Sequence, residues 1–441
     1  MYGKLLLTLV ILITIFSAAN AQKIQRITYN ELPKGADSLE IHEGILIQHA
    51  MKIKYKRNGR KVATIELSEP VMIAMADQEE KWGYFQFPSI GKGEDGSFRV
   101  SWQMKDDSHL TYGKESNRVY KPMVSYNEGK TWHQQNENYK IKGYSILMSD
   151  GSYLQVLTPE SKNINNYKNF PKRVGKRGQY TYYKVNLLPD ELRGVYLNYV
   201  DANGKLERIH ATLNDPGLLR YAIGDQMPLL WWGNIKELSD GTLVAGVYPT
   251  NYLDEQGNPT LSGVSFYQSK DCGKNWDVLS RITYNTDGVT EYRGDRRFDE
   301  PSFEILPDST FICVMRTGSA SPMCKSFSYD KGRTWTKPEP FTPNGVAPSC
   351  LMLKNGVLVL TSGRPGVQVR FSLDGGRNWT DAIDMIPFSQ GDEAFELSCG
   401  YVSIIEKDDC TFFMTYSDFT KKNGNGENRK SIWVRKVSIQ R

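Results

Sequence analysis

The sequence predicts an all-β protein, a six-bladed β-propeller with a repeated hairpin turn in its blades. Two interleaved repeats and the lack of any long stretch with helical periodicity support this prediction. Aromatic side chains make up 12% of the 441 residues, and they favour strands over helices. A β-sandwich is the alternative architecture, but it does not account for two interleaved repeats.

The first repeat is an octet with the pattern Ser-x-Asp/Asn-x-Gly-x-Thr/Asn-Trp. Its four copies are residues 125–132, 269–276, 328–335 and 372–379. The Asp or Asn can hydrogen-bond to the backbone that follows it, the Gly supplies a positive φ angle, and the Trp packs back as an apolar plug. Because each copy follows a strand-like run, we predict a hairpin turn in which the Asp is structural rather than catalytic.

The second repeat is looser and consists of an apolar strand, Asp-Gly or an equivalent pair, and another strand. It occurs at residues 95–96, 150–151, 240–241, 308–309, 355–356 and 408–409. Each of these hairpins resembles the inner hairpin of a four-stranded blade. Six hairpins therefore predict six blades, with the octets at the outer turns of four of them.

The remaining segments suggest a domain layout. Residues 1–21 combine Lys4, an apolar run and small residues before Gln22, which is typical of a secretory signal peptide. A transmembrane anchor is the alternative, but the apolar run is too short to span a bilayer comfortably.

We expect residues 22–75 to supply strands that close or flank the propeller, for example by pairing with the C-terminal run 431–439. The propeller is expected over residues 76–441. An insertion at about 162–225, with strands at 180–187 and 193–200, is expected to extend one blade or form a lid.

The composition excludes several classes of protein. The formal net charge is only +5 and there is no long Lys/Arg run, so we expect no nucleic-acid partner. Five histidines and no Cys/His spacing argue against a zinc site, and no later segment is expected to span a membrane. The cysteines that lie inside apolar strand patterns, such as Cys313, are expected to be buried free thiols. The mature protein is expected to be secreted or periplasmic.

The octet is similar to the Asp-box, or BNR repeat, of the sialidase (neuraminidase) superfamily, and the chain resembles bacterial exo-sialidases. Glu300 and Arg316 flank one inner hairpin, in the order and spacing of the family's catalytic Glu and second active-site Arg. Arg316 also ends an apolar run, where a charge without a role is costly. Arg364 resembles the family's third Arg. Tyr401, which enters the sixth inner hairpin, resembles the family's nucleophile.

One position departs from the family and another stays open. The family carries an Arg-Ile-Pro motif on its first inner strand, whereas the matching run here, residues 84–90, has Gln86 in the Arg place. One member of the arginine triad that binds the carboxylate of sialic acid is therefore missing. Two guanidinium groups can still make bidentate contacts, and Gln86 could donate a neutral hydrogen bond. The family's acid is an Asp on the following loop, where Asp106 and Asp107 are both candidates.

The resemblance implies a glycoside hydrolase, exo-acting and retaining, that cleaves a terminal, sialic-acid-like sugar from a glycan. Tyr401 would be the nucleophile and Glu300 its general base, and Asp106 or Asp107 would protonate the leaving group. If the substrate lacks a carboxylate, Glu300 and an Asp could act as an ordinary carboxylate pair. Trp231 is expected to contact the sugar, because carbohydrate stacks on flat rings. No metal or organic cofactor is implied.

Two other functional classes stay open. A glycan-binding propeller without turnover would keep the tryptophans and arginines, but it would not need Tyr401, Glu300 and an Asp to converge. A polysaccharide lyase acting on uronates would use Tyr and Arg for β-elimination. In each case the expected partner is a glycan or an oligosaccharide.

Overall fold

The computed structural model describes residues 45–57, 60–93, 95–116, 118, 122–135, 145–284, 297–318, 321–364, 366–386 and 397–441. The expected signal peptide, residues 1–21, lies outside the described residues. Regular structure in the described ranges consists of strands and short 3₁₀ helices: η1 (Ile164–Asn166), η2 (Val185–Leu187) and η3 (Asp190–Leu192). The predicted all-β class is therefore confirmed. In these ranges, no helix has both the length and the apolar character needed to cross a membrane.

All six predicted inner hairpins are present as antiparallel strand pairs. They are β5 (Tyr84–Lys92) with β6 (Phe98–Met104), β9 (Ser145–Leu147) with β10 (Tyr153–Leu157), β18 (Trp232–Glu237) with β19 (Leu243–Thr250), β22 (Asp299–Ile305) with β23 (Phe311–Arg316), β26 (Val346–Met352) with β27 (Leu358–Gly363), and β30 (Val402–Asp408) with β31 (Thr411–Lys422).

The turns of these hairpins all contain the same type of hydrogen bond. In every turn the side-chain oxygen of the first residue of the pair accepts from the backbone N–H two residues later, as in Asp308 Oδ1 with Thr310 N at 3.0 Å. The other acceptors are Asp95, Asp150, Asp240, Asn355 and Asp408. This Asx-type bond explains why the second repeat is visible in the sequence.

Outer strands complete the sheets. The order is β5-β6-β7-β8 in one sheet and β22-β23-β24-β25 in another, where β7 is Met123–Ser125, β8 is His133–Gln134, β24 is Cys324–Ser328 and β25 is Glu339–Pro340. A third sheet has the order β1-β29-β28-β27-β26, with β1 (Ile45–Leu46) parallel to β29 (Ile383–Asp384) and next to it β28 (Val367–Ser372).

Two further hairpins belong to one eight-stranded sheet. Its order is β18-β19-β20-β21-β15-β14-β10-β9, because β15 (Leu206–Asn214) pairs in parallel with β21 (Asn275–Ile282). The other strands are β14 (Val195–Val200) and β20 (Gly263–Ser269). The innermost strands contact one another in the succession β9, β18, β22, β26, β30 and β5. The predicted propeller architecture is confirmed, while the count of six blades stays a prediction because two expected blades share this sheet.

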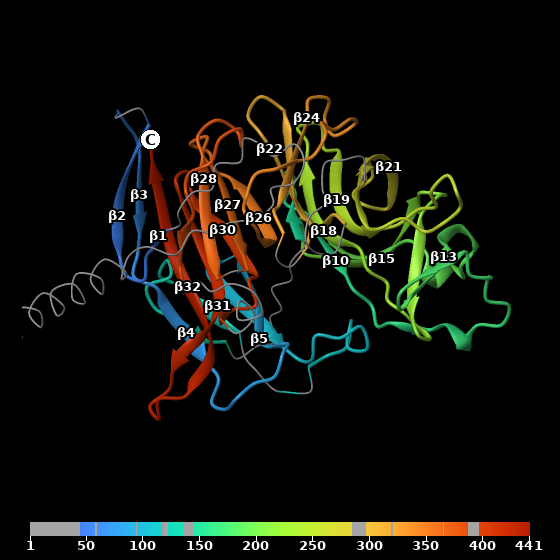
Figure 1. The fold of residues 1–441 in the computed structure, drawn as a ribbon, viewed down its shortest axis with the longest axis horizontal. Helices are drawn as coiled ribbons and strands as arrows, with labels where there is room; N and C mark the ends of the chain where they lie inside the picture. Colours follow the sequence, from blue (N-terminus) through green and yellow to red (C-terminus); the bar gives the residue numbers. More distant parts are fainter. Residues whose placement is uncertain are drawn as a thin grey trace, which may run out of the picture.

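The two ends of the described chain meet in the last sheet. The C-terminal strand β32 (Asn428–Gln440) pairs with β31, and it also pairs with β3 (Arg60–Leu67) and β4 (Val71–Met75). The first strand of this group, β2 (Met51–Arg57), pairs with β3. Figure 1 shows these blue strands beside the red C-terminal strand.

The insertion forms a separate five-stranded sheet of order β11-β17-β16-β13-β12. Its strands are β11 (Lys162–Asn163), β12 (Gly175–Arg177), β13 (Tyr180–Lys184), β16 (Leu219–Ile223) and β17 (Gln226–Met227). The strand expected at 193–200 is not part of it, because β14 pairs with β10 of the propeller. Val195 and Leu197 alternate into the blade core and so fix this register. The insertion therefore consists of two segments that flank the β14–β15 hairpin.

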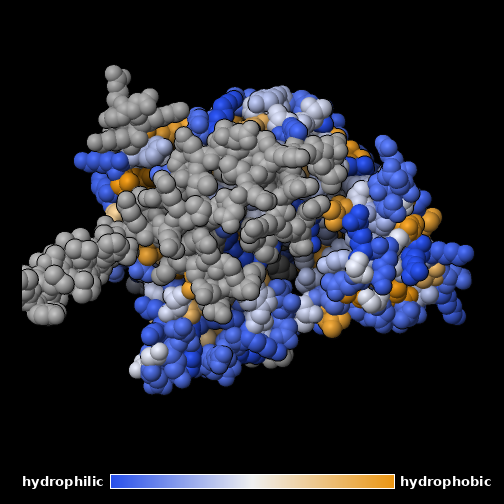
Figure 2. All heavy atoms as spheres, viewed as in Figure 1, coloured by the Kyte–Doolittle hydropathy of each residue, from blue (hydrophilic) through white to orange (hydrophobic). Residues whose placement is uncertain are grey.

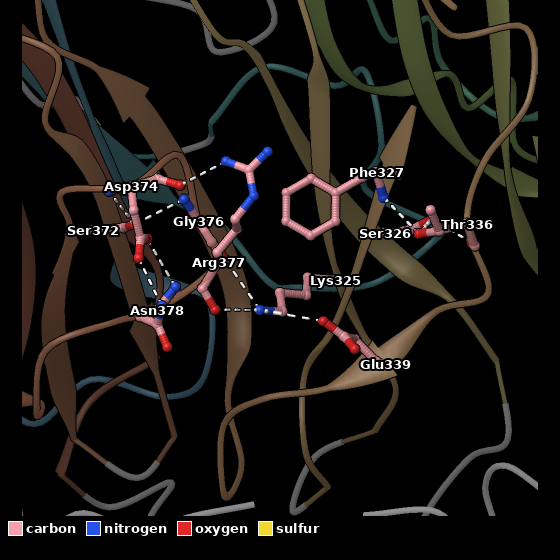
Figure 3. A network of polar contacts seen from close by, with 10 residues as sticks. All are labelled: Lys325, Ser326, Phe327, Thr336, Glu339, Ser372, Asp374, Gly376, Arg377 and Asn378. Atoms are coloured by element: carbon pink, nitrogen blue, oxygen red, sulfur yellow. Dashed lines mark hydrogen bonds and ion pairs between the residues drawn. The ribbon is translucent and has the colours of Figure 1, made fainter. Parts of the chain in front are cut away.

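The octets form the expected turns, and Figure 3 shows one of them. Ser372 Oγ accepts from Gly376 N at 2.7 Å, and Asp374 Oδ1 accepts from Asn378 N at 2.8 Å. The same two bonds recur in the other three copies. Lys325 of β24 then donates to the carbonyls of Gly376 and Arg377 at 3.0 and 2.9 Å, which ties this turn to the neighbouring sheet.

All six cysteines are described and free. Cys313, Cys324, Cys350 and Cys399 are buried, and burial raises the pKa of the Cys313 thiol well above its ordinary value. The expectation of buried free thiols inside the strands is confirmed for Cys313.

A buried carboxyl on β29 makes stability depend on pH. Asp384 accepts from Gln368 Nε2 at 2.8 Å, and burial raises its pKa to about 6. Because the folded-state pKa lies above the ordinary value, the fold favours the neutral acid. Its contribution to stability is complete below about pH 4 and is lost as the pH rises through about 6, by about 3 kcal/mol in total.

We expect Asp384→Asn to reduce the loss of melting temperature between pH 5 and pH 8, because the amide stays neutral. Thermal denaturation of both proteins at the two pH values measures this. Asp190→Asn, at an exposed carboxyl, is the control and should leave the pH dependence unchanged. An equal pH dependence in the wild type and in Asp384→Asn would contradict the assignment.

Candidate active site

A cavity of about 1280 Å³ opens where the inner strands converge. Its walls come from β5, β18, β22, β26 and the start of β30, from the loop after β6, and from the insertion. Hydrogen bonds between serine side chains and the backbone of the adjacent inner strand surround the cavity. Cys350 N donates to Ser302 Oγ at 2.9 Å, and Ile90 N donates to Ser403 Oγ at 3.2 Å. These contacts hold the strands that carry the site.

Three inner strands carry the same local distortion. Phe87, Glu300 and Ala347 have positive φ angles of 51°, 48° and 48°, and each is followed by Pro and Ser. The strand register shifts at each point, as in a β-bulge. All three residues line the cavity. The bulge re-aims these side chains, at a conformational cost of about 1–3 kcal/mol for each residue.

The centre of the site is a carboxylate with three partners. Tyr401 OH donates to Glu300 Oε1, and Arg316 Nη1 lies 2.7 Å from the same oxygen. The second oxygen, Oε2, accepts from Ala347 N at 2.7 Å. Arg316 Nε in turn donates to the carbonyl of Gly318 at 3.1 Å. The sequence-predicted Tyr401, Glu300 and Arg316 are thus in direct contact, although 101 residues separate the first two.

The electrostatics keep the Tyr401 phenol protonated at rest. Burial and then the neighbouring Glu300 carboxylate raise its pKa well above the ordinary value, while Arg316 and Arg364 oppose this shift. A phenol in this state can act as a nucleophile only if Glu300 accepts its proton as the new bond forms. The hydrogen bond between the two groups already has the direction that such a transfer needs.

Arg364 lies beside the Tyr401 ring and is not among the residues that line the cavity. Its Nε donates to the carbonyl of Cys399 at 3.2 Å, and its Cζ lies 5.8 Å from the centre of the Tyr401 ring and 5.5 Å from that of Trp82. Burial lowers the pKa of this guanidinium. Its positive charge therefore lies close to the Tyr401 phenol, whose pKa it lowers.

The structure separates the two acid candidates. Asp106 forms an ion pair with Lys81 at 2.8 Å and does not line the cavity. Asp107 does line it, and its Oδ2 accepts from Trp82 Nε1 at 3.0 Å. The geometry thus favours Asp107 as a group that can reach a bound substrate.

Gln86 and Trp231 lie away from the cavity, which corrects the expectation that they touch substrate. Gln86 is completely buried and accepts from Gly83 N at 2.7 Å, so that it holds the turn that carries Trp82. The two register shifts in β5 turn Phe87 to the cavity instead. Trp231 is 5% exposed and packs edge-to-face on Trp276 in the blade core. Its neighbour Trp232 faces the opposite way and lines the cavity.

Sequence reasoning missed Trp82, Phe87 and most of the aromatic cavity wall. One signal could have located Phe87. A triplet in which a variable residue is followed by Pro and Ser recurs at 87–89, 300–302 and 347–349. No comparable pattern marks Trp82. Within the described ranges, no group of three or more His, Cys, Asp or Glu side chains could hold a metal ion.

The comparisons with known proteins agree with this architecture. Residues 223–414 match the family model described as a BNR repeat-like domain, whereas no curated protein matches the chain. A protein of unknown function from Dyadobacter fermentans is similar in structure, with a TM-score of 0.57 and 19% identity over 85% of this chain and 99% of that chain. The expected BNR repeat is therefore confirmed over residues 223–414.

Two further solved structures are similar at lower scores. A Hadza microbial sialidase has a TM-score of 0.48 and 16% identity, over 85% of this chain and 70% of that chain. An α-L-arabinanase of Penicillium chrysogenum, complexed with arabinobiose, has a TM-score of 0.47 and 14% identity, over 83% of this chain and 98% of that chain.

The Glu300–Arg316 pair can be tested through stability. Both side chains are only 10% exposed, and removing one partner of a buried pair leaves an uncompensated charge. We expect Glu300→Ala to lower the free energy of unfolding by about 3 kcal/mol, and the double variant Glu300→Ala/Arg316→Met to recover much of it. Denaturant unfolding measures both effects.

Glu66→Ala, which breaks the exposed pair with Lys52, is the control and should change stability by less than about 1 kcal/mol. A double variant no more stable than Glu300→Ala would contradict the idea that the unpaired Arg316 charge causes the loss.

Proposed function

We propose that this protein is a secreted or periplasmic glycoside hydrolase, exo-acting and retaining, that removes a terminal, sialic-acid-like sugar from a glycan. The observation that carries the proposal is the contact of Tyr401, Glu300 and Arg316 at one cavity, with Asp107 on another wall of it. A binding protein would not need a buried phenol aligned with a base. Secretion is proposed from residues 1–21, and an amino terminus at Gln22 in the exported protein would test it.

In the proposed first step, Tyr401 Oη attacks the anomeric carbon while Glu300 Oε1 accepts the phenolic proton. Arg316 stabilises the Glu300 carboxylate at rest and the phenolate that develops in the transition state. Ala347 N fixes the orientation of Glu300 through the other oxygen. A neutral nucleophile suits a sugar whose anomeric centre carries a carboxylate, because a second carboxylate would be repelled.

Asp107 would protonate the oxygen of the leaving group in the first step. In the second step it would take a proton from water as the water oxygen attacks the anomeric carbon, the bond from that carbon to Tyr401 Oη breaks, and Glu300 returns its proton to the phenolate. Trp82 has a positioning role here, because its indole N–H holds Asp107 Oδ2. Gly83 is packed too closely for a side chain, since an added Cβ would lie 2.6 Å from Asp107 N. The Trp82–Gly83 turn therefore fixes the loop that bears the acid.

A second candidate is hydrolysis of a terminal sugar without that carboxylate, by Glu300 and Asp107 as a carboxylate pair. The observation that favours it is that two of the three positions matching the family's arginines do not line the cavity, although Lys105, Lys236 and Arg297 do. Phe87 takes the cavity-facing place on the first inner strand, and Arg364 lies beside the Tyr401 ring and is not part of the cavity lining. Arg316 is then the only one of the predicted arginines that lines the cavity.

The central test is hydrolysis of an aryl α-sialoside by the chain from residue 22, beside a panel of neutral terminal-sugar and uronate reporters. We expect sialoside cleavage, and we expect Tyr401→Phe to lower kcat by at least about 10²-fold because the nucleophilic oxygen is lost. Cleavage only of a neutral sugar would favour the carboxylate pair. An unsaturated, ultraviolet-absorbing product would favour a lyase, and binding without any turnover would contradict the hydrolase proposal.

A second test separates the acid from its neighbour. We expect Asp107→Asn to reduce kcat strongly for substrates with a poor leaving group, such as the hydroxyl group of another sugar. The reduction should be much smaller for a nitrophenol leaving group, which needs little protonation. Trp82→Phe should show the same dependence on the leaving group at about tenfold, because it loses the hydrogen bond that orients Asp107. Kinetics with paired substrates measure both.

Asp106→Asn is the matched control, since its carboxylate pairs with Lys81 outside the cavity. It should leave both substrates unaffected. A larger effect at Asp106 than at Asp107 would overturn the assignment.

A further inference from the structure

One wall of the cavity is built from aromatic side chains that the proposed chemistry does not use. We name it the aromatic wall, and its members are Tyr112, Tyr180, Tyr182, Tyr221, Trp232 and Tyr248. They come from the loop after β6, from β13 and β16 of the insertion, and from β18 and β19. The insertion and the propeller therefore line the cavity together.

The rings of the aromatic wall support one another mainly through their edges. Tyr112 meets Trp232 with ring centres 5.3 Å apart and planes at 87°, and Tyr180 meets Tyr221 at 4.9 Å and 74°. Trp232 also contacts Tyr248 at 5.7 Å. Edge-to-face packing fixes a ring without stacking another ring on its face. Such a wall can present apolar ring faces, together with phenol groups, to a ligand in the cavity.

The phenol groups of the wall are neutral hydrogen-bonding groups. Burial raises the pKa of Tyr112 and of Tyr182 to about 12, and it also raises the pKa of Tyr221. Neutral phenols both donate and accept, as sugar hydroxyls do. The wall thus combines the two contacts that a carbohydrate offers, an apolar ring face and hydroxyl groups.

The aromatic wall begins next to the proposed acid. Asp107 interacts electrostatically with Tyr112, whose phenol also interacts with Tyr180. In a glycosidase the acid lies beside the glycosidic oxygen, with the nucleophile on the other side of the anomeric carbon. Groups on the acid's side of the cavity consequently face the leaving group rather than the terminal sugar.

The insertion has the packing needed to hold this wall in place. Its own apolar core includes Leu188, Leu192, Ala222 and Met227, all fully buried. Arg177 of β12 donates from Nε to the carbonyl of Pro259 at 2.7 Å, and so fastens the sheet edge to the propeller. In Figure 2 the face of the insertion turned to the viewer is largely hydrophilic, with scattered apolar side chains.

We propose that the aromatic wall is a subsite for the leaving group, which binds the sugar units next to the scissile bond, so that the preferred substrate is an oligosaccharide rather than a simple glycoside. The inference rests on the proposed function, because the acid Asp107 defines which side of the cavity takes the leaving group. The insertion is thereby a specificity element for the reducing-end part of the glycan.

The test compares two substrates that share the same terminal sugar and the same class of leaving group. Methyl α-sialoside has no sugar in the leaving group, whereas 3′-sialyllactose has two. We expect kcat/KM to be at least about tenfold higher for 3′-sialyllactose, and Trp232→Ala and Tyr180→Ala to reduce this ratio by about tenfold, mainly through KM. A tenfold change corresponds to about 1.4 kcal/mol of binding.

Tyr126→Ala is the matched control, because Tyr126 is a surface tyrosine outside the cavity, 67% exposed. It should leave the ratio unchanged. A wall variant that lowers kcat/KM for both substrates equally, or for neither, overturns the subsite while the proposed function stands. If another terminal sugar proves to be the substrate, its methyl glycoside and its lactoside form the pair.

A binding measurement keeps the subsite testable if no turnover is found. Lactose and N-acetyllactosamine are titrated into the wild type and into the wall variants, with saturation-transfer NMR as the readout. Binding that Trp232→Ala and Tyr180→Ala abolish supports the subsite even if the proposed hydrolysis fails. No binding to either probe, together with no difference between the paired substrates, overturns it.

Discussion

The carboxylate of Glu300 is the interaction on which the rest of the site depends. It joins Tyr401, Arg316 and the backbone of Ala347, which come from different inner strands or their ends. A carboxylate this buried is tolerable only when both oxygens are satisfied. Here Tyr401 and Arg316 satisfy Oε1, and the backbone N–H of Ala347 satisfies Oε2. The same contacts that orient the chemistry thus also link strands β22, β23 and β26 with the start of β30.

Backbone strain explains how three similar strands can point different groups at one cavity. Phe87, Glu300 and Ala347 occupy equivalent bulges with positive φ, so the fold supplies three inward positions and the sequence decides what each one carries. Phe87 carries an aromatic ring and Glu300 a carboxylate. Ala347 carries only a methyl group, and its backbone N–H donates to Glu300. Strain of this kind persists where surrounding contacts over-determine the backbone, as the Ser302 and Ser403 bonds between neighbouring strands do.

The sequence predicted what is local and repeated. The hairpin turns at 95–96 and 308–309 and the octet at 372–379 were visible because each rests on a hydrogen bond between residues two or four positions apart. Glu300, Arg316 and Tyr401 could be singled out only through resemblance to a family. Gln86 was misplaced because a bulge reverses the alternation of its strand, and nothing in the spacing alone reveals a bulge. Trp231 was misplaced because neighbouring residues face opposite ways, so that Trp232 lines the cavity instead. The choice between Asp106 and Asp107 needed the position of Trp82, which is set by tertiary packing.

The placement of charge and aromatic surface suggests how binding energy would be divided in the proposed enzyme. Around the terminal sugar, Phe87 and the withdrawn Arg364 leave Arg316 as the one predicted arginine in the cavity, and it is already paired with Glu300. Next to Asp107 the aromatic wall offers apolar ring surface to a ligand. Binding energy from parts of a substrate remote from the reacting bond can position that bond and raise kcat. Contacts on the leaving-group side, where the insertion has placed its tyrosines, would therefore help to position the scissile bond in the proposed enzyme.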